Sequence, residues 1–382
     1  MIYYITYIKS NALDYLNLRV SPAADQKSKY IAEVLDSFEE EYRIINLAET
    51  TNKTGLYRSI DKPYLNYGHI MTFNGFGKPN KIFNKLHYYF TNYQLKIFLM
   101  NLTSNDIVIS YHSLFTAKLF TKIKKKNNFK LILELEEKYQ DVVKCSQRLS
   151  YWEDEVIKCA DAYILATAFL SNYIPKDKPY VVCNGTYKVE HKRNVKRNDD
   201  KIHCVYAGTL DPTKGGAAAA AAAAEFLNEK YHMHILGFGS EEQTVNIQKI
   251  IDSVSNKSNC IVTFDGLKSG EEYIQFLQSC DIGLCTQIPD AQYVNTSFPS
   301  KILVYLANGL RVISVDIPAV RNSEIGGKLF YYKKQNSKEI AEQIMNVDTN
   351  IEFDSRNLLI ELDRKFKHEL KKLIQDLEVI HE

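Results

Sequence analysis

The sequence predicts an α/β protein with two doubly wound, mostly parallel sheets. Short β-rich segments alternate with helical segments along most of the chain, which is the pattern of a parallel sheet covered by helices. A polar stretch at residues 187–201 interrupts this alternation with charge and no apolar periodicity, and the alternation then resumes. The chain has 382 residues, which is enough for two domains that each bury a core.

In the first half, strands and helices are expected in alternation. The β-rich runs are Ile2–Ile8, Arg43–Leu47, Asp106–Ser110, Lys130–Glu134, Ala162–Ala166 and Pro179–Val182. The segments with helical periodicity are Asp25–Phe38, Lys81–Met100, Leu114–Lys126 and Arg148–Cys159.

The second half repeats the pattern. Strands are expected at His203–Tyr206, His232–Leu236, Ile261–Phe264, Ile282–Cys285 and Arg311–Ser314. Helices are expected at Ala217–Leu227, Glu241–Ser253, Gly270–Gln278, Ser300–Asn308 and Ser337–Met345. We therefore place an N-terminal domain at residues 1–190, a linker at 191–201, a C-terminal domain at 202–354 and an amphipathic helix at 355–382.

Composition excludes several classes of protein. The apolar share of 45% and the charged share of 25% are typical of a soluble globular protein, and a net charge of +2 gives no field suited to nucleic acid. The seven cysteines form no CxxC pair and no Cys/His spacing suited to zinc. The chain starts without a basic segment typical of a signal peptide, and no apolar run reaches the roughly 18–20 residues that span a bilayer. We expect a cytoplasmic protein.

Three loops of the second half are suited to anions. The run from Ala207 to Gly216 follows a strand and precedes a helix, so its glycines bring backbone amides near a helix N-terminus while Lys214 adds a charge. The segment Leu236–Ser240 (LGFGS) has the same position after the next strand. The third loop is Asn295–Lys301 (NTSFPSK). Ordinary glycine turns and a capped helix are the alternatives.

Taken together, three anion-binding loops in one sheet domain indicate a diphosphate ligand. The chain has no Walker lysine motif, and no GxGxxG follows its first strand, which argues against an ATPase and a dehydrogenase.

Four segments resemble the nucleotide-binding half of family 4 retaining glycosyltransferases, which have the GT-B fold. They are VYAGTLDPTKGG, HILGFGSEE, VTFDGLKSGEEYIQFLQSCDIGL and SFPSKILVYLANGLRVIS, in the family's order and spacing. The first half is similar more loosely, through NLRVSPAADQKSKYI, IVISYHS, LELEEKYQDV, CADAYILAT and VVCNGTY. The resemblance implies a nucleotide-diphosphate sugar, with UDP as the expected carrier, as donor substrate and no further cofactor.

The resemblance also implies which residues contact the nucleotide sugar. Lys214 would neutralise the diphosphate, and His112 would lie beside the sugar, with a structural hydrogen bond as its alternative role. The donor residues are Gly208, Thr209, Lys214, Gly215, Gly237, Phe238, Gly239, Gly266, Leu267, Tyr273, Thr296, Ser297, Phe298 and Lys301.

Three positions depart from the family pattern. Its two glutamates fall on Thr296 and Val304, and the arginine of its first phosphate loop falls on Thr209. A glutamate in place of Val304 would bind ribose hydroxyls, so the chain is either a divergent enzyme or a catalytically silent relative that binds an active partner.

The acceptor side is expected in the first half. Glu134, Glu136 and Glu137 follow a strand, where they would face the cleft between domains; Glu134 and Glu136 are candidates for a base or for binding sugar hydroxyls. Asn17 and Arg19 lie in the loop after the first strand, where the family approaches sugar and phosphate. A solvated charge cluster and an ordinary surface loop are the alternatives.

The expected function is retaining, metal-independent sugar transfer to a glycan or lipid-linked glycan in bacterial-type surface polysaccharide synthesis. No DxD motif stands at a strand end, so Lys214 and helix dipoles would stabilise the leaving diphosphate. The basic run at residues 122–130 could rest on anionic lipid, and the apolar stripe of the C-terminal helix could contact a partner chain; a solvated helix end and packing within the chain are the alternatives.

Overall fold

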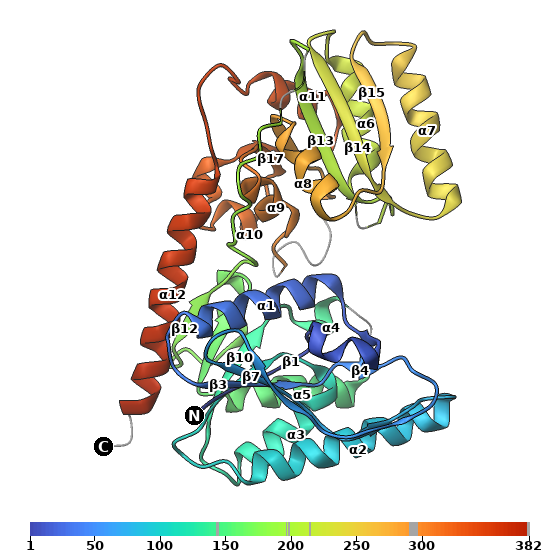
Figure 1. The fold of residues 1–382 in the computed structure, drawn as a ribbon. Helices are drawn as coiled ribbons and strands as arrows, with labels where there is room; N and C mark the ends of the chain where they lie inside the picture. Colours follow the sequence, from blue (N-terminus) through green and yellow to red (C-terminus); the bar gives the residue numbers. More distant parts are fainter. Residues whose placement is uncertain (143–144, 196, 198, 214, 290–296, 380–382) are drawn as a thin grey trace. The chain divides into compact units, whose positions relative to one another are not determined.

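The computed structural model describes residues 1–142, 145–195, 197, 199–213, 215–289 and 297–379. The chain forms two compact units (Figure 1). The first contains Met1–Thr186 and the C-terminal residues from Lys365 onward, and the second contains Tyr187–Arg364. Both are layered α/β structures, which confirms the predicted fold class.

The first unit is built on an eight-stranded sheet. In spatial order its strands are β12 (Tyr180–Val182), β11 (Ala162–Leu165), β10 (Lys130–Leu135), β9 (Ile107–Tyr111), β1 (Ile2–Thr6), β3 (Tyr42–Asn46), β7 (Gly68–Thr72) and β6 (Asp61–Tyr64). Neighbouring strands are parallel except for β6 and β7, which are antiparallel. The carboxyl ends of its seven parallel strands therefore share one edge, where ligands of open α/β sheets bind.

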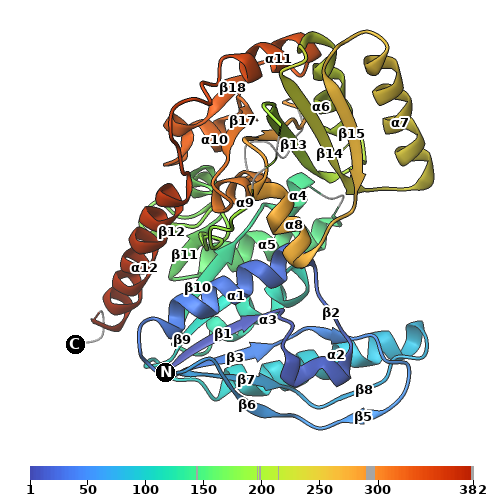
Figure 2. The same ribbon diagram turned by 45° about the horizontal axis from the view of Figure 1, so that its top comes forward.

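Helices cover both faces of this sheet (Figures 1 and 2). Helix α1 (Pro22–Asp36) lies on one face, and α2 (Lys81–Met100), α3 (Leu114–Lys124) and α5 (Gln147–Cys159) lie on the other. Shorter helices are η1 (Asn11–Leu16), α4 (Tyr139–Val142) and η2 (Ala168–Tyr173). Phe120, Phe129 and Tyr163 are almost fully buried in the core between the sheet and this second helical layer.

The segment between β3 and α2 contains strands that the sequence did not predict. Besides β6 and β7, it contains β4 (Glu49–Thr50), which pairs with β2 (Leu18–Arg19), and β5 (Leu56–Tyr57), which pairs with β8 (Gly75–Phe76). Three of the strands in this segment, β4, β5 and β8, have only two residues, and β6 is mostly exposed. Two-residue strands and an exposed strand show no apolar periodicity, which explains why they are not predicted. β7 has five residues with alternating burial, and its GHIMT sequence begins with a glycine and contains only two β-branched residues.

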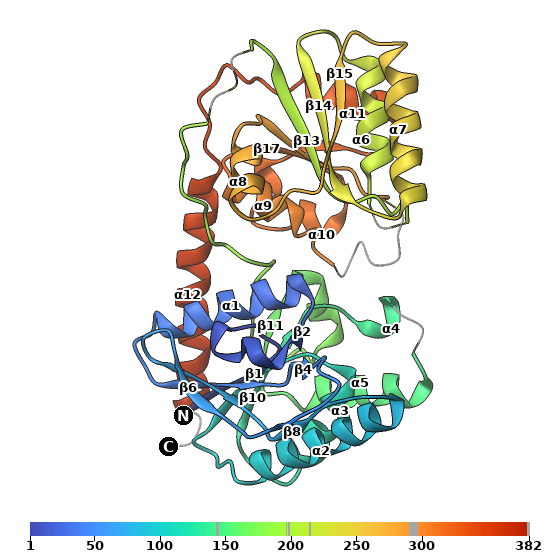
Figure 3. The ribbon, with the colours of Figure 1, turned by 45° about the vertical axis from the view of Figure 1, so that its right-hand side comes forward.

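The second unit is built on a six-stranded, fully parallel sheet. Its spatial order is β15 (Ile261–Gly266), β14 (Tyr231–Phe238), β13 (Ile202–Thr209), β16 (Ile282–Cys285), β17 (Arg311–Val315) and β18 (Phe330–Tyr332). Helices α6 (Ala217–Ala223), α7 (Glu241–Ser255) and α11 (Ser337–Met345) cover one face, and α8 (Gly270–Gln278) and α9 (Lys301–Ala307) cover the other (Figure 3). Shorter helices are η3 (Ala224–Phe226), α10 (Pro318–Arg321) and η5 (Gly326–Lys328).

The C-terminal helix α12 (Arg356–Val379) belongs to both units. Its start is tied to the second unit by Arg356, whose Nη2 donates to the carbonyl of Asn308 over 2.8 Å. Its later part packs on the first unit, where Phe366 is 1% exposed and stacks on Tyr30 of α1 with ring centroids 6.0 Å apart. Among the described residues, no helix is both long and apolar enough to cross a bilayer.

Candidate donor and acceptor sites

The ends of β13 and β14 bring two predicted donor glycines together. These strands run to Thr209 and Phe238, so Gly208 and Gly237 lie near the ends of the strands. The sequence predicts both glycines in loops, so this is a difference from the prediction. The two glycines are paired in register. A Cβ atom added to Gly237 would lie 2.0 Å from the carbonyl oxygen of Gly208, so only a glycine allows this close approach.

The turn after β13 folds back tightly on the strand end. The Tyr206 hydroxyl donates to the carbonyl of Thr209 over 2.8 Å and accepts from the amide of Gly216 over 3.2 Å. A Cβ on Gly215 would lie 2.4 Å from the Thr209 oxygen. Two predicted donor residues, Lys214 and Thr296, lie outside the described residues.

Lys301 supplies a cation beside Gly208. Its Nζ lies 4.0 Å from the centroid of the Tyr206 ring and would be 2.9 Å from a Cβ added to Gly208. The side chain is half-buried, and it forms no ion pair with any residue that the structure describes. A cation without a carboxylate partner, placed where two parallel strands end, is suited to a phosphate group.

The other described residues of the third predicted loop lie just before α9. Phe298 is buried, at 7% exposure, and Ser300 makes no side-chain capping hydrogen bond to α9. Val304 is half-buried in α9, and its carbonyl accepts from Asn308 Nδ2 over 2.9 Å. Ser297 is half-buried.

Exposed apolar groups stand at the ends of β14 and β15. Phe238 and Leu267 are 60% and 69% exposed, although apolar side chains of this size are usually covered. Gly266, the last residue of β15, has a φ of +70°, and Tyr273 of α8 is half-buried. Gly239 leads into α7, whose first turn is fixed by a reciprocal capping box between Ser240 and Gln243. These exposed faces could stack on a nucleotide base.

The first unit contains a cavity of about 370 Å³ at the carboxyl ends of β1, β9 and β10. It includes three of the predicted acceptor-side residues, namely Arg19, Glu136 and Glu137. The remaining lining residues are Tyr7, Val20, Ser21, Ala23, Ala24, Tyr111 and Tyr139. Carboxylates, a guanidinium group and tyrosine rings form a mixed lining that can bind sugar hydroxyls and stack on sugar faces. Asn17 does not line it, because its Nδ2 donates to Asn52 Oδ1 over 2.6 Å.

Lys27, which is not among the site residues predicted from the sequence, contacts one residue that lines this cavity. Its Nζ lies 2.9 Å from Glu136 Oε1 and donates to the carbonyl of Cys183 over 2.8 Å, although the residue is only 5% exposed. One sequence signal could have identified it. Lys27 stands three and four residues before the buried Tyr30 and Ile31 of α1, so a charge occupies the apolar face of an amphipathic helix.

Glu134 does not face an open cleft, which corrects the sequence prediction. It is fully buried, its Oε2 accepts from the Tyr4 hydroxyl over 2.8 Å, and it does not line the cavity. Burial raises the pKa of Glu134 to about 7, with a smaller contribution from the charge of Glu136, while Lys27 opposes the shift. Burial likewise raises the pKa of Glu137.

His112 follows β9, as predicted, but its ring is enclosed. It is 1% exposed, and neither ring nitrogen has a hydrogen-bond partner among the described residues. Nε2 lies 3.6 Å from Oε1 of the buried Glu153, whose carboxylate accepts from the amide of Tyr139 over 2.7 Å. Burial, with a smaller contribution from the charge of Lys138, lowers the pKa of His112 to about 3, so the ring is neutral near pH 7. Its catalytic role stays a prediction.

We expect Glu134→Gln to change how stability depends on pH. The folded-state pKa of Glu134 is about 7 against an ordinary value of 4.5, so its contribution is full below about pH 4.5 and is lost as pH rises towards 7. The free energy of unfolding of wild type minus that of the variant should therefore fall over this range by at most about 3 kcal/mol. The lowered pKa of His112 makes the free energy of unfolding rise with pH, but this change is the same in wild type and variant and cancels in their difference.

Urea unfolding followed by fluorescence measures this difference. The only tryptophan, Trp152, lies in α5 and packs against the core of the first unit, so its emission reports on that unit. A difference between the two proteins that stays constant between about pH 5 and about pH 7.5 would show that Glu134 is ionised throughout.

Known proteins resemble this chain in two ways: a family model matches part of its sequence, and solved structures share its fold. Residues 188–366 match the family model described as glycosyl transferases group 1. No curated protein sequence matches the chain. Solved structures with the GT-B fold of glycosyltransferases resemble the chain over nearly its whole length, and the chain therefore has two Rossmann-like domains of the GT-B fold.

Three of these structures illustrate the likeness. The apo structure of OtsA has a TM-score of 0.64 at 12% identity and covers 98% of both chains. A trehalose-6-phosphate protein from E. coli bound with UDP-2-fluoro glucose has a TM-score of 0.61 at 12% identity and covers 99% of both. Sucrose-phosphate synthase from Thermosynechococcus elongatus has a TM-score of 0.60 at 12% identity and covers 99% of this chain and 96% of its own. The TM-scores indicate a shared fold, and at identities this low the likeness extends to the fold alone.

Proposed function

We propose that the protein is a family 4 glycosyltransferase that moves a sugar from a nucleotide-diphosphate sugar to a glycan or lipid-linked glycan, with retention of configuration. The second unit binds the donor, with UDP as the carrier to test first, and the first unit binds the acceptor. The reaction needs no metal ion and contributes to surface polysaccharide or glycoconjugate synthesis in the cytoplasm, with contact at the inner face of the membrane where the acceptor is lipid-linked.

The observation that carries this proposal is the family match at residues 188–366, which includes the glycine-bearing ends of β13 and β14. Lys301 adds a half-buried cation next to Gly208, at the position where a diphosphate would lie. The structural neighbour that is bound with UDP-2-fluoro glucose supports UDP sugars as the first donors to test.

The proposed chemistry rests on stabilising the leaving diphosphate. Breaking the bond between sugar and phosphate leaves negative charge on the diphosphate while positive charge develops on the sugar carbon. Cations fixed in advance lower this barrier, and Lys301 and Lys214 are the candidates for that role. In a front-face route the leaving phosphate accepts the proton of the acceptor hydroxyl, so the protein need not supply a nucleophile.

On the acceptor side, we assign sugar binding to the cavity of the first unit. Glu136 and Glu137 accept hydrogen bonds from hydroxyl groups, Arg19 binds an anionic group, and the tyrosines provide stacking faces. The enclosed Glu134 and His112 do not touch an acceptor in this arrangement and act instead on the shape and charge of the cavity wall.

A thermal-shift screen against UDP, GDP, ADP and their sugars, without added metal, tests the proposal. A ligand at about 100 times its dissociation constant stabilises the folded protein by roughly 2.7 kcal/mol. Stabilisation by one nucleotide and its sugars, followed by release of that nucleotide in the presence of acceptor, is the expected result. Absence of stabilisation by every nucleotide would contradict donor binding.

The alternative is a catalytically silent relative that binds or stabilises an active partner. Val304 favours it, because an apolar side chain stands where the family binds ribose. The same screen separates the two functions: a silent relative would bind a nucleotide without turnover or bind none.

We expect Lys214→Ala to abolish sugar transfer while the protein stays folded. The resemblance assigns Lys214 to the diphosphate, and loss of one cation on a developing charge costs about a hundredfold or more in rate. Turnover measured as nucleotide release, with circular dichroism as the folding control, checks this. Turnover equal to that of the wild type would remove Lys214 from the site.

A further inference from the structure

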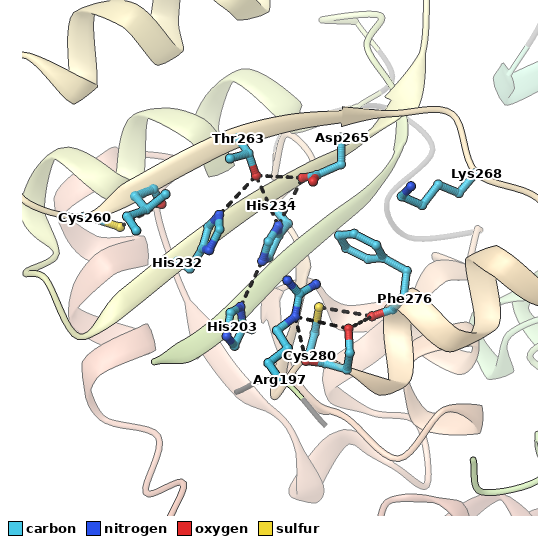
Figure 4. Close-up of polar contacts among 12 residues, drawn as sticks. Arg197, His203, His232, His234, Cys260, Thr263, Asp265, Lys268, Phe276 and Cys280 are labelled. Atoms are coloured by element: carbon cyan, nitrogen blue, oxygen red, sulfur yellow. Dashed lines mark hydrogen bonds and ion pairs between the residues drawn. The ribbon is translucent and has the colours of Figure 1, made fainter. Parts of the chain in front are cut away.

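Three histidines of the second unit gather on one face of its sheet, outside the proposed donor site (Figure 4). His203 on β13 is paired in register with His232 on β14, and His234 follows two residues later, so all three side chains point to the same face. His203 and His234 are buried, at 2% and 1% exposure, and His232 is half-buried. One ring nitrogen from each histidine lies within 4.8 Å of the others.

Two carboxylates fix the orientation of two of these rings. Nε2 of His203 lies 2.8 Å from Asp199 Oδ1, and Nδ1 of His234 lies 3.1 Å from Asp265 Oδ2. An ionised carboxylate can only accept, so each of these nitrogens carries a proton. The other nitrogens, Nδ1 of His203 and Nε2 of His234, face each other 3.0 Å apart.

In this arrangement no positively charged group of the described residues lies between the two facing ring nitrogens. With both outer nitrogens protonated, the two facing nitrogens each present a lone pair unless one ring carries a second proton. Two lone pairs that face each other at 3.0 Å repel. A cation between the facing nitrogens removes the conflict. Metal-ligating histidines characteristically donate their outer N–H to a carboxylate, which is the contact seen at both rings.

We propose that His203 Nδ1, His234 Nε2 and a ring nitrogen of His232 bind a divalent transition-metal ion, with Zn²⁺ as the expected occupant. Three neutral imidazoles are a ligand set that zinc prefers, and a water molecule completes a tetrahedral shell. Ligand nitrogens of a tetrahedral zinc site are about 3.3 Å apart, so the facing pair needs to open by only a few tenths of an ångström. Nε2 of His232 contacts Thr263 Oγ1 at 3.2 Å, which leaves its Nδ1 as the third ligand.

Arg197 is the cation nearest to this cluster in Figure 4, and its contacts are compatible with a metal ion. Its Nε donates to the carbonyl and the hydroxyl of Ser279, both over 3.2 Å, and its guanidinium lies 4.9 Å from the centroid of the Phe276 ring. The guanidinium is therefore committed to α8. Asp199 and Asp265 offset its charge and that of the ion.

The proposed site is structural and does not depend on the proposed function. It would cross-link β13 to β14, and through Asp265 it would hold β15 as well. No sequence motif indicates this site, because 28 residues separate His203 from His232 and only the register of parallel strands brings them together.

Zinc content of the untagged full-length protein tests the proposal. After incubation with Zn²⁺ and gel filtration, the wild type is expected to retain about one zinc ion per chain. His234→Asn and His232→Asn should lose it, and Asp265→Asn should bind zinc about 10–100-fold more weakly. Co²⁺ in place of zinc should give visible absorption bands of a tetrahedral site in the wild type and none in the histidine variants.

His69→Asn is the matched control. His69 also pairs with an aspartate, its Nδ1 lying 2.9 Å from Asp61 Oδ1, but its side chain is 39% exposed and it belongs to no group of three possible metal ligands among the described residues. It should retain zinc like the wild type. His232→Asn decides the matter if the buried variant does not fold, because His232 is half-buried. Wild-type protein without bound zinc, or equal zinc in His232→Asn and His69→Asn, would overturn the proposal.

Discussion

Replacing Lys301 by methionine is expected to weaken binding of the nucleoside diphosphate by about 10–100-fold. Hydrogen bonds to charged groups contribute about 1.5–3 kcal/mol, which corresponds to this range of affinity. Methionine keeps an unbranched stem against the Tyr206 ring, so the substitution removes the charge with little loss of packing. Lys301 forms no ion pair within the described chain, so its loss leaves no carboxylate there unpaired.

Isothermal titration with the nucleotide identified by thermal shift measures this loss. Lys257→Met is the matched control in the same unit, because Lys257 is exposed and only 3.5 Å from Glu225. It should bind the nucleotide like the wild type. Both variants should unfold at nearly the temperature of the wild type in the absence of ligand. If Lys301→Met binds as tightly as Lys257→Met, the diphosphate does not lie beside Gly208.

The sequence predicted the long elements well because their local signals agree. The helix Lys81–Met100 was placed to the residue, since an apolar stripe continues for 20 residues and the Asn80 side chain accepts from the amides of Ile82 and Phe83 at its start. Strands were less well bounded. β13 and β14 continue past the predicted Tyr206 and Leu236 because glycine was interpreted as a loop signal.

Features that depend on the tertiary structure were beyond the sequence. Alternation along β10 indicates the face on which Glu134 lies, but it cannot show that Tyr4 and the rest of the core cover that face. The closeness of Gly208 and Gly237 likewise depends on the register of two strands. Resemblance supplied the residue types of the donor site, whereas the placement of the Lys301 ammonium on the Tyr206 ring required the structure.

Replacing Lys27 by methionine is expected to lower the free energy of unfolding of the first unit by about 3–5 kcal/mol. Removal of one partner of a buried ion pair leaves the other charge without compensation, which is the costly half of the exchange. Here the loss affects Glu136, at 2.9 Å, and also withdraws the favourable charge near the buried Glu134. The carbonyl of Cys183 loses its hydrogen bond as well. Urea unfolding followed by Trp152 emission reports this unit.

The double variant Lys27→Met/Glu136→Gln tests how much of the lost stability comes from the unpaired carboxylate of Glu136. If the cost comes from an uncompensated carboxylate, neutralising Glu136 should restore a large part of the lost stability, because neutral groups of similar shape often replace a buried ion pair at little cost. Glu136→Gln alone should cost less than Lys27→Met, because Lys27 keeps its hydrogen bond to the Cys183 carbonyl and the favourable charge of Glu134. A double variant no more stable than Lys27→Met would show that the cost comes from the Cys183 carbonyl and the buried Glu134, and that the charge of Glu136 contributes little.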